Sequence, residues 1–254
     1  MEPRPIEVGR VTALFRYPVK SMAAERLQLA ELGWHGFAGD RRLALRKLED
    51  RSGFPWLSAS RVPELLRFTP MWREGASPDA PPTHVRTPEG EELPTFGDAL
   101  ASEVGRRLGA PVQMMAMRQG IFDEASVSVI ATETIEAICR EARVGADVRR
   151  FRPNVLVSLL GPGAFQEDRW IGGELVFGDA AAAARVSVTQ PDERCAMLNL
   201  DPDTAHSTPE VMKAAVRQNA NNAGVYGVCV RQGRIAVGDR VFLRGPEHRQ
   251  AGDS

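Results

Sequence analysis

The chain has 254 residues, which is enough for one large domain or two of modest size. Hydrophobic residues make up 43% and charged residues 26%, as in folded globular proteins, which argues against disorder and against a coiled coil. Lys and Arg number 32 against 33 Asp and Glu, so there is no basic excess for nucleic acid. No apolar run approaches the roughly 20 residues of a membrane span, and no signal core opens the chain. We expect a cytoplasmic protein with no nucleic-acid partner and no membrane span.

The N-terminal half is predicted to consist mainly of strands. Alternate residues of 11–17 share one face, and Pro18, which has no backbone N–H, ends that ladder. Residues 42–46 form a second strand candidate after a glycine-rich connection. A helix is predicted to begin at Asp98, a plausible N-cap. Residues 111–120 are ambiguous, and their Met cluster fits core packing better than a set of metal ligands.

The C-terminal half is predicted to combine many short strands with two helices. One helix begins near Thr132 and ends at Gly145, and the other begins at 207–210, where Ser-Thr-Pro-Glu resembles a capped start. Many short strands with few helices indicate an α+β, mostly β architecture that contains a β-barrel. We expect one module over 8–120 and a second domain over 121–245. The predicted strands of this half are 127–130, 155–158, 174–177, 185–188, 225–230, 234–237 and 240–243.

The three cysteines form no Cys-x-x-Cys pair, so we expect a reducing compartment. Cys139 lies on the apolar face of a predicted helix and Cys229 lies in a predicted strand, which favours two buried, inert thiols. Cys195 follows a polar turn and comes directly after Arg194, a cation that favours the thiolate form. Because the thiolate ligates metals and attacks electrophiles, Cys195 is the candidate functional cysteine; an inert residue on an exposed loop is the alternative.

Other common catalytic motifs are absent from the sequence. It contains no GxGxxG, P-loop, HExxH or GxSxG, and the four histidines are too scattered to form a short metal-ligand pair. Several residues after predicted strand ends and glycine-rich loops could instead supply a phosphate site, because Lys, Arg and Ser are the usual anion donors. A solvated surface charge is the alternative for each basic residue. These candidates are Lys20, Ser21, Arg41 and Arg152.

Several short motifs follow one another in a recognisable order along nearly the whole chain. In the first half they are Tyr-Pro-Val-Lys-Ser at 17–21, Gly-Asp-Arg at 39–41 and Ser-Ala-Ser-Arg-Val-Pro at 58–63. In the second half they are Phe-Arg-Pro-Asn at 151–154, Phe-Gln-Glu-Asp-Arg-Trp at 165–170, Arg-Cys at 194–195, Asp-Pro-Asp-Thr at 201–204 and Gly-Arg-Ile-Ala-Val-Gly-Asp at 233–239. The set resembles the MOSC family, the molybdenum cofactor sulfurase C-terminal domain, with its N-terminal β-barrel module.

This resemblance implies a MOSC β-barrel preceded by an N-terminal β-barrel-like module. The nearest functional relatives that it implies are similar to the mitochondrial amidoxime reducing component and its bacterial counterparts. Those enzymes hold a molybdenum cofactor (Mo-molybdopterin, a pyranopterin dithiolene), and we expect no dependence on pyridoxal phosphate. One protein cysteine ligates the molybdenum, and Cys195 matches it as metal ligand and catalytic residue. The cofactor-binding residues implied by the resemblance are Lys20, Ser21, Arg41, Asp123, Arg152, Asn154, Arg194 and Cys195.

The residues before Cys195 depart from the family pattern. The family's loop commonly reads Pro-Cys-x-Arg-Cys, with a small polar residue before the arginine, whereas here Asp192 and Glu193 precede Arg194. A carboxylate near an anionic cofactor repels it unless Arg194 compensates, so this change bears on substrate choice and on cofactor retention. Glu124 is a second unusual residue, in the loop that lines the cofactor in the family.

Three functions are compatible with these residues. The first is a molybdenum-dependent oxidoreductase that reduces N-hydroxylated compounds, with electrons from a separate flavin, haem or iron–sulfur protein. The second is a binding protein or carrier for the molybdenum cofactor, or for a sulfur on its cysteine, without its own turnover. The third is a barrel that has lost the cofactor, for which Glu193 is the best argument. The first two, and above all the oxidoreductase, are favoured by the joint presence of Lys20, Arg41, Arg152, Asn154 and Cys195.

Overall fold

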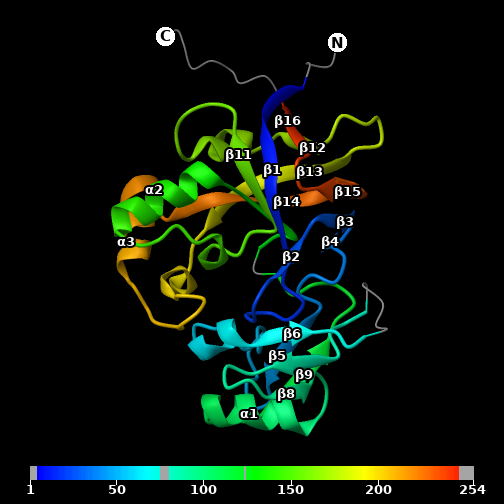
Figure 1. Ribbon diagram of the computed structural model, residues 1–254, viewed down its shortest axis with the longest axis vertical. Helices are drawn as coiled ribbons and strands as arrows, with labels where there is room; N and C mark the ends of the chain where they lie inside the picture. The colour runs from blue at the N-terminus through cyan, green and yellow to red at the C-terminus, as the bar shows by residue number, and fades with distance from the viewer. Residues whose placement is uncertain (1–4, 75–79, 123, 246–254) are drawn as a thin grey trace.

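The protein is described by a computed structural model that covers residues 5–74, 80–122 and 124–245. Its elements form two bodies, which lie one above the other in Figure 1. The larger body is a β-barrel flanked by helices, and the smaller one is a module of short sheets with one helix. The predicted fold class, α+β and mostly β with a barrel, is confirmed.

Seven strands close the barrel, and each of them pairs with two neighbours. β10 (Val127–Ala131) and β11 (Val155–Leu159) are parallel, because the connection between them crosses over through α2 (Thr132–Ala142). All other neighbours in the barrel are antiparallel. The order around the barrel is β1 (Ile6–Arg16), β11, β10, β14 (Asn222–Arg231), β13 (Ala184–Glu193), β12 (Glu174–Phe177) and β16 (Arg240–Arg244), which pairs again with β1.

Apolar side chains fill the interior of the barrel. At the start of β13, residues alternate between buried and half-buried, so that Ala184, Val186 and Val188 join the core. β1 and β11 approach each other closely at Gly9, where a Cβ atom would lie 2.3 Å from the carbonyl oxygen of Ser158. This position therefore requires glycine.

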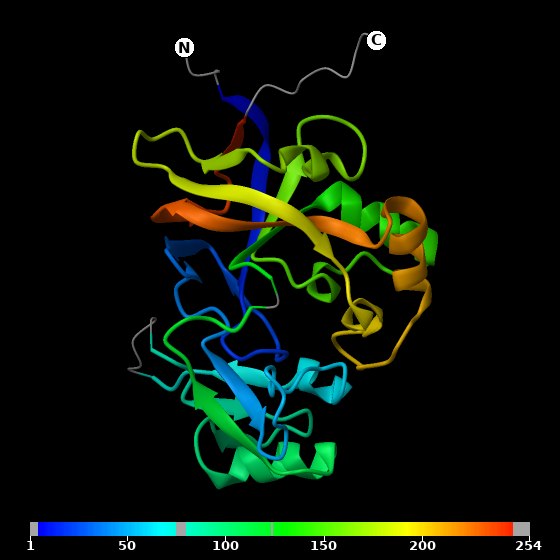
Figure 2. The same ribbon diagram turned by 180° about the vertical axis from the view of Figure 1, so that it is seen from behind.

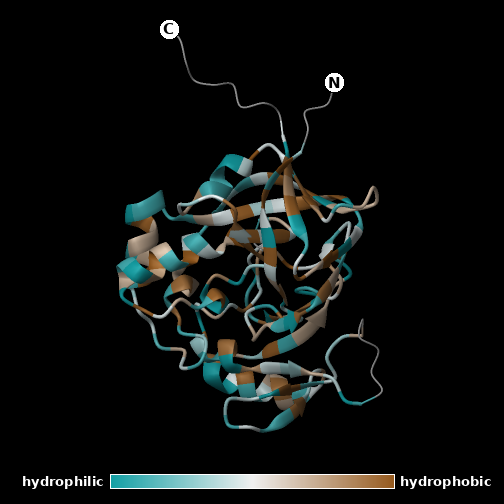
Figure 3. Ribbon diagram, turned by 45° about the horizontal axis from the view of Figure 1, so that its top comes forward, coloured by the Kyte–Doolittle hydropathy of each residue, from teal (hydrophilic) through white to brown (hydrophobic). Residues whose placement is uncertain are grey.

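α2 and α3 (Glu210–Asn219) pack against each other on one side of the barrel (Figures 1 and 2). Hydrophobic and hydrophilic residues alternate in bands along the helices, as expected for helices with one buried face (Figure 3). Their apolar sides share a cluster with Ile130, Phe151 and Leu198. This packing fixes two segments at the end of the barrel, the turn that carries Arg152 and the short helix that follows Cys195.

The smaller module has a core of its own. Its α1 (Asp98–Leu108) contacts the last strand of a three-stranded sheet and one strand of a two-stranded sheet. The three-stranded sheet consists of β6 (Thr69–Met71), β7 (His84–Arg86) and β8 (Glu92–Pro94), and the two-stranded sheet of β5 (Leu43–Lys47) and β9 (Val112–Ala116). β3 (Leu29–Gly33) pairs on one side with β4 (Gly36–Phe37) and on the other with β15 (Gly233–Ala236), which comes from near the end of the chain. β2 (Glu25–Leu27) extends the barrel sheet beside β1. The 3-10 helices are η1 (Pro63–Arg67), η2 (Val148–Arg150), η3 (Gln166–Trp170) and η4 (Ala196–Asn199).

Most predicted elements are confirmed; in the smaller module one ambiguous segment is resolved and one helix cap differs from prediction. The ambiguous segment 111–120 contains strand β9, and Met114 packs in the core as its Met cluster predicted. The N-cap of α1 is Gly97 and not Asp98. Asp98 is the first helical residue, where its carboxylate lies near the positive end of the helix dipole.

The second half departs from prediction mainly at β13. This strand continues to Glu193 instead of ending near 188, because it stays paired with β14 as far as Asn222 through several register shifts. β1 belongs to the first half of the chain, yet it pairs with β11 and β16 and so completes the barrel. The division between residues 120 and 121 stays a prediction.

Candidate functional site

A cavity of about 680 Å³ lies between the smaller module and one end of the barrel. The segments after β1 and β4 contribute to it, as do the turn before β11, the end of β13 and the start of η4. Six of the eight predicted site residues line this cavity, although they lie far apart in the sequence. They are Lys20, Ser21, Arg41, Arg152, Arg194 and Cys195.

The other two predicted site residues are Asn154 and Asp123. Asn154 is only 1% exposed and lies behind the cavity wall, where it contacts Asp40 and Arg41. Asp123 lies outside the described residues, so its predicted role stays a prediction. Its neighbour Glu124 does line the cavity.

Three of the lining residues adopt a left-handed backbone conformation, which residues other than glycine rarely do. Their φ angles are +66° for Ser21, +49° for Arg41 and +52° for Arg152. Each such conformation costs on the order of 1–3 kcal/mol and persists only where the surrounding structure enforces it. Backbone strain of this kind concentrates at binding and catalytic sites, so its presence at three predicted residues favours a binding role for this wall.

Lys20 and Ser21 lie where the chain leaves the barrel for the smaller module. Pro18 follows the end of β1, and the backbone N–H of Lys20 then donates to the carbonyl oxygen of Leu43 at 2.8 Å. Lys20 is 7% exposed, and its Nζ atom lies 5.3 Å from the centroid of the Phe54 ring. The packing therefore holds a buried cation at the cavity.

Arg41 is held by a buried carboxylate. Its guanidinium donates to Asp40, which is fully buried, and to the carbonyl oxygen of Arg152 at 3.1 Å. Its backbone N–H donates to the carbonyl oxygen of Tyr17 at 2.7 Å. Burial lowers the pKa of Arg41, but the charge of Asp40 and the nearby tyrosines outweigh this effect, so the pKa lies above its ordinary value. Arg41 is a fixed cation of the cavity.

Asn154 connects this ion pair to the barrel. Its Nδ2 group donates to Asp40 at 3.1 Å and to the carbonyl oxygen of Phe15 at 3.2 Å. Its Oδ1 atom accepts the backbone N–H of Ser128 at 3.1 Å. Asn154 therefore links β1 and β10 to the carboxylate that orients Arg41, which makes it a positioning residue in this structure.

Tyr17 forms an aromatic platform for two of the cations. The guanidinium carbons of Arg41 and Arg152 lie 4.7 and 4.2 Å from the centroid of its ring. Its hydroxyl donates to the carbonyl oxygen of Pro153 at 3.1 Å, and Arg152 Nη1 donates to the carbonyl oxygen of Met22 at 2.9 Å. Burial raises the pKa of Tyr17 to about 12, so the hydroxyl stays protonated.

The end of β13 contains a second buried ion pair. Arg194 Nη2 lies 2.8 Å from Asp192 Oδ2, and the same guanidinium donates to the carbonyl oxygens of Ala223 and Phe151. Asp192 is 2% exposed and accepts the hydroxyl of Ser128 at 2.7 Å. Burial raises the pKa of Asp192, although Arg194 opposes this effect. The side chain of Arg194 thus compensates Asp192 and not Glu193.

The environments of the three cysteines match the prediction. Cys139 and Cys229 are buried, and burial raises the pKa of both thiols. Cys195 is exposed, free and part of the cavity lining. It is the N-cap residue of η4, and its carbonyl oxygen accepts the backbone N–H of Leu198 at 3.0 Å. A thiol reachable from solvent lies in the same cavity as the cations.

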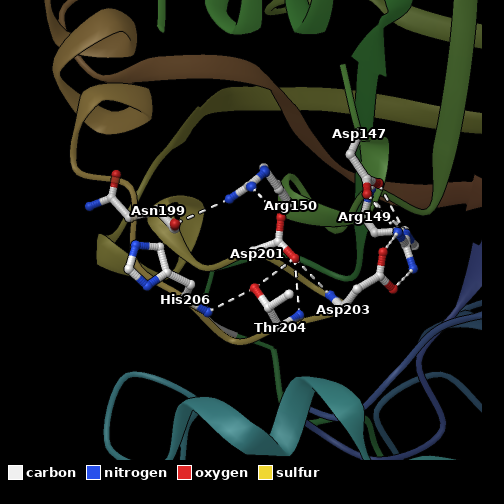
Figure 4. A network of polar contacts seen from close by, with 8 residues as sticks. All are labelled: Asp147, Arg149, Arg150, Asn199, Asp201, Asp203, Thr204 and His206. Atoms are coloured by element: carbon white, nitrogen blue, oxygen red, sulfur yellow. Dashed lines mark hydrogen bonds and ion pairs between the residues drawn. The ribbon is translucent and has the colours of Figure 1, made fainter. Parts of the chain in front are cut away.

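A polar network supports the segment that follows Cys195 (Figure 4). Arg150, which also lines the cavity, donates to Asp201 Oδ2 at 2.6 Å and to the carbonyl oxygen of Asn199 at 3.1 Å. The other oxygen of Asp201 accepts the backbone N–H groups of Asp203 and Thr204. This turn is the Asp-Pro-Asp-Thr motif at 201–204, so its role here is to fix the chain beyond η4.

Several lining residues were not predicted from the sequence. Ser58 and Ser60 lie in the quoted motif at 58–63, which could have signalled them. Arg150 was indistinguishable from a surface charge, because its partner Asp201 is distant in sequence. Tyr226 lies in a predicted strand and carried no signal.

In the described ranges, no three His, Cys, Asp or Glu residues lie close enough together to hold a metal ion by themselves. A metal in this cavity would therefore need most of its ligands from a bound group.

Two family models match the chain, the MOSC N-terminal beta barrel domain over residues 8–118 and the MOSC domain over residues 98–242. The chain belongs to the MOSC family. MOSC domains are associated with binding of the molybdenum cofactor and with sulfurase-like and oxidoreductase proteins.

No curated protein matches this MOSC chain in sequence. The solved structure of the YuaD protein from Bacillus subtilis is 13% identical, covers 96% of this chain and 99% of that chain, and has a TM-score of 0.52, which supports the fold alone. YiiM from Geobacillus stearothermophilus is 24% identical over 47% of this chain and 54% of that chain, with a TM-score of 0.35. The narrower likeness to the amidoxime reducing component stays a prediction. Among the described helices, none is both long and apolar enough to cross a membrane.

Proposed function

We propose that this MOSC protein binds the molybdenum cofactor in the cavity and reduces N-hydroxylated compounds with electrons from a separate donor protein. The observation that supports this most is the composition of one cavity. An exposed thiol, Cys195, shares it with Lys20, Arg41 and Arg152. The cavity therefore combines a soft metal ligand with cations suited to a phosphate.

The donor set fits a cofactor that brings its own metal ligands. A single cysteine thiolate suits a thiophilic metal whose remaining ligands come from a dithiolene, and the described residues offer no protein-only metal cluster. The buried Lys20 and the half-buried Arg41 and Arg152 suit a phosphate with close to two negative charges. The cavity volume of about 680 Å³ lies within the usual range for cofactor and ligand sites. When bound, the cofactor would supply the two-electron redox chemistry.

Each protein group then has a distinct task. Lys20, Ser21 and Arg41 bind the phosphate, and the left-handed backbone at Ser21 and Arg41 orients them for this role. Arg152 adds a planar cation that stacks on Tyr17. Asn154 acts through Asp40 and Arg41.

Arg194 has a different task, at the other wall of the cavity. Its hydrogen bonds to the carbonyl oxygens of Phe151 and Ala223 hold the backbone that leads into Cys195.

In the net reaction the N–O bond of the substrate breaks. The donor protein supplies two electrons and solvent supplies two protons, and the products are water and the amine or amidine. The protein's own residues bind and orient the reactants.

A carrier of the cofactor, or of a sulfur on Cys195, is the second candidate. The exposure of Cys195 supports it, because a partner protein can reach this thiol. The two candidates differ in turnover. The oxidoreductase converts benzamidoxime to benzamidine repeatedly when a chemical reductant is present, whereas a carrier retains the cofactor but produces no benzamidine.

The cysteines provide the sharpest test of the proposal. Cys195→Ala is expected to abolish reduction of benzamidoxime by chemically reduced protein. Cys139→Ala and Cys229→Ala are the controls, because both remove small buried side chains; each should cost about 1 kcal/mol of stability and keep its activity per folded molecule. Activity is normalised to folded protein. If Cys195→Ala turns over like the wild type, the proposed metal ligand is wrong.

A further inference from the structure

Glu193 places a carboxylate on the cavity wall two residues before Cys195. The residue is exposed, and within the described part of the chain its carboxylate has no hydrogen-bond or ion-pair partner. The preceding residue, Asp192, differs in both respects: it is buried, and its charge is compensated by Arg194 at 2.8 Å. Successive residues of a strand point to opposite sides, which explains how two adjacent acids have such different environments.

Three cations of the cavity are paired with carboxylates other than Glu193. Arg194 is bound to Asp192, Arg150 is bound to Asp201, and Arg41 is bound to Asp40. Glu124, the other exposed acid of the cavity, accepts a hydrogen bond from the neutral Gln190 at 3.4 Å. The wall next to Cys195 therefore presents exposed carboxylates, whereas the opposite wall presents Lys20 and Arg41.

We infer that Glu193 is a specificity-determining residue that favours substrates with a positive charge beside the reacting nitrogen. This inference rests on the proposed function. Substrates of this class include N-hydroxyguanidines, which are protonated more readily than neutral amidoximes. Their amidinium-like N–H groups form a planar fork that can donate two charge-assisted hydrogen bonds to one carboxylate.

The expected preference is moderate because Glu193 is exposed. An exposed ion pair is screened by solvent and contributes little, whereas a hydrogen bond to a charged group contributes more. We therefore expect a five- to tenfold higher affinity for the cationic substrate than for the neutral one. This corresponds to a difference in binding free energy of about 1–1.4 kcal/mol, between the contribution of an exposed ion pair and that of a charged hydrogen bond. It should weaken as the ionic strength rises, because salt screens exposed charges.

Binding of two nearly isosteric probes tests this inference without any turnover. Benzamidine is a cation and benzamide is neutral, and their affinities for the purified protein can be compared by calorimetric titration. We expect the wild type to prefer benzamidine by five- to tenfold and Glu193→Gln to lose most of that preference. Glu136→Gln is the matched control, an exposed acid on α2 away from the cavity, and should retain the preference. Equal binding of both probes to the wild type, or an unchanged preference in Glu193→Gln, would overturn the inference.

Kinetics separates a failure of this inference from a failure of the proposed function. The ratio of kcat/KM for phenyl-N-hydroxyguanidine to that for benzamidoxime is measured at low salt in the wild type and in Glu193→Gln. A ratio that falls about fivefold or more in the variant supports the role of Glu193. A ratio that is the same in both proteins overturns that role and leaves the proposed function intact. If the wild type reduces neither compound, the proposed function fails, and the probe titration still decides whether the wall selects cations.

Discussion

Replacing Asp40 with Asn is expected to lower the free energy of unfolding by about 3–5 kcal/mol, the usual effect of breaking a buried ion pair. Asp40 is fully buried, pairs with Arg41, and accepts the backbone N–H of Tyr17 at 2.7 Å and Nδ2 of Asn154 at 3.1 Å. An amide can replace only one of its oxygens as an acceptor. Its NH₂ group would then face the donors of Arg41 and Asn154, which leaves a buried guanidinium without its counter-charge.

Thermal and denaturant unfolding measure this effect. For a chain of this size, each 1 kcal/mol shifts Tm by roughly 2–4 °C, so the Tm of Asp40→Asn should fall by about 6–20 °C. Glu31→Gln is the control, because Glu31 forms an exposed ion pair with Arg234, which contributes at most about 1 kcal/mol. The double variant of Asp40→Asn with Arg41→Gln should lose less than the sum of the single changes, since neither charge remains buried alone. If Asp40→Asn is within about 1 kcal/mol of the wild type, the buried pair does not hold Arg41 in place.

Two further predictions concern the phosphate contacts and a buried acid. Lys20→Ala should lower cofactor affinity about ten- to hundredfold, as measured by occupancy at limiting cofactor. The control Lys213→Ala, at an exposed position of α3, should not; equal occupancy in Lys20→Ala and the wild type would remove Lys20 from the site. Burial raises the pKa of Glu167, so the folded protein binds this proton more tightly than the unfolded chain does, and stability falls as pH rises above the ordinary carboxyl range. In Glu167→Gln this fall in stability above the ordinary carboxyl range should be smaller in denaturant unfolding, and an identical pH dependence would contradict the assignment.

The sequence was informative where local chemistry decides the outcome. Apolar surroundings predicted that Cys139 and Cys229 are buried, and a polar turn predicted that Cys195 is exposed; the structure agrees. The family motifs also selected residues distant in sequence, such as Lys20 and Arg152, that line the same cavity. Such motifs predict which distant residues share a cavity, because all of these residues are needed together to form one binding site.

The sequence was less informative where strand register decides the outcome. β13 continues past its predicted end through register shifts, and this extension places Asp192 inside the protein and Glu193 at the surface. The sequence alone could not predict which of these two acids forms the ion pair with Arg194. In the same way, Asn154 was predicted as a direct cofactor contact, whereas its position behind the wall depends on the pairing of β1 with β11. Such relations arise from tertiary pairing, which single-residue chemistry does not specify.

The most direct test of the account is the molybdenum and pterin content of the wild-type protein purified from a host that makes the cofactor. The cavity that contains Lys20, Arg41, Arg152 and Cys195 predicts about one molybdenum and one pterin per chain. Molybdenum is measured by mass spectrometry and the pterin by fluorescence after oxidative release. Folded protein from such a host that contains neither would contradict the central claim.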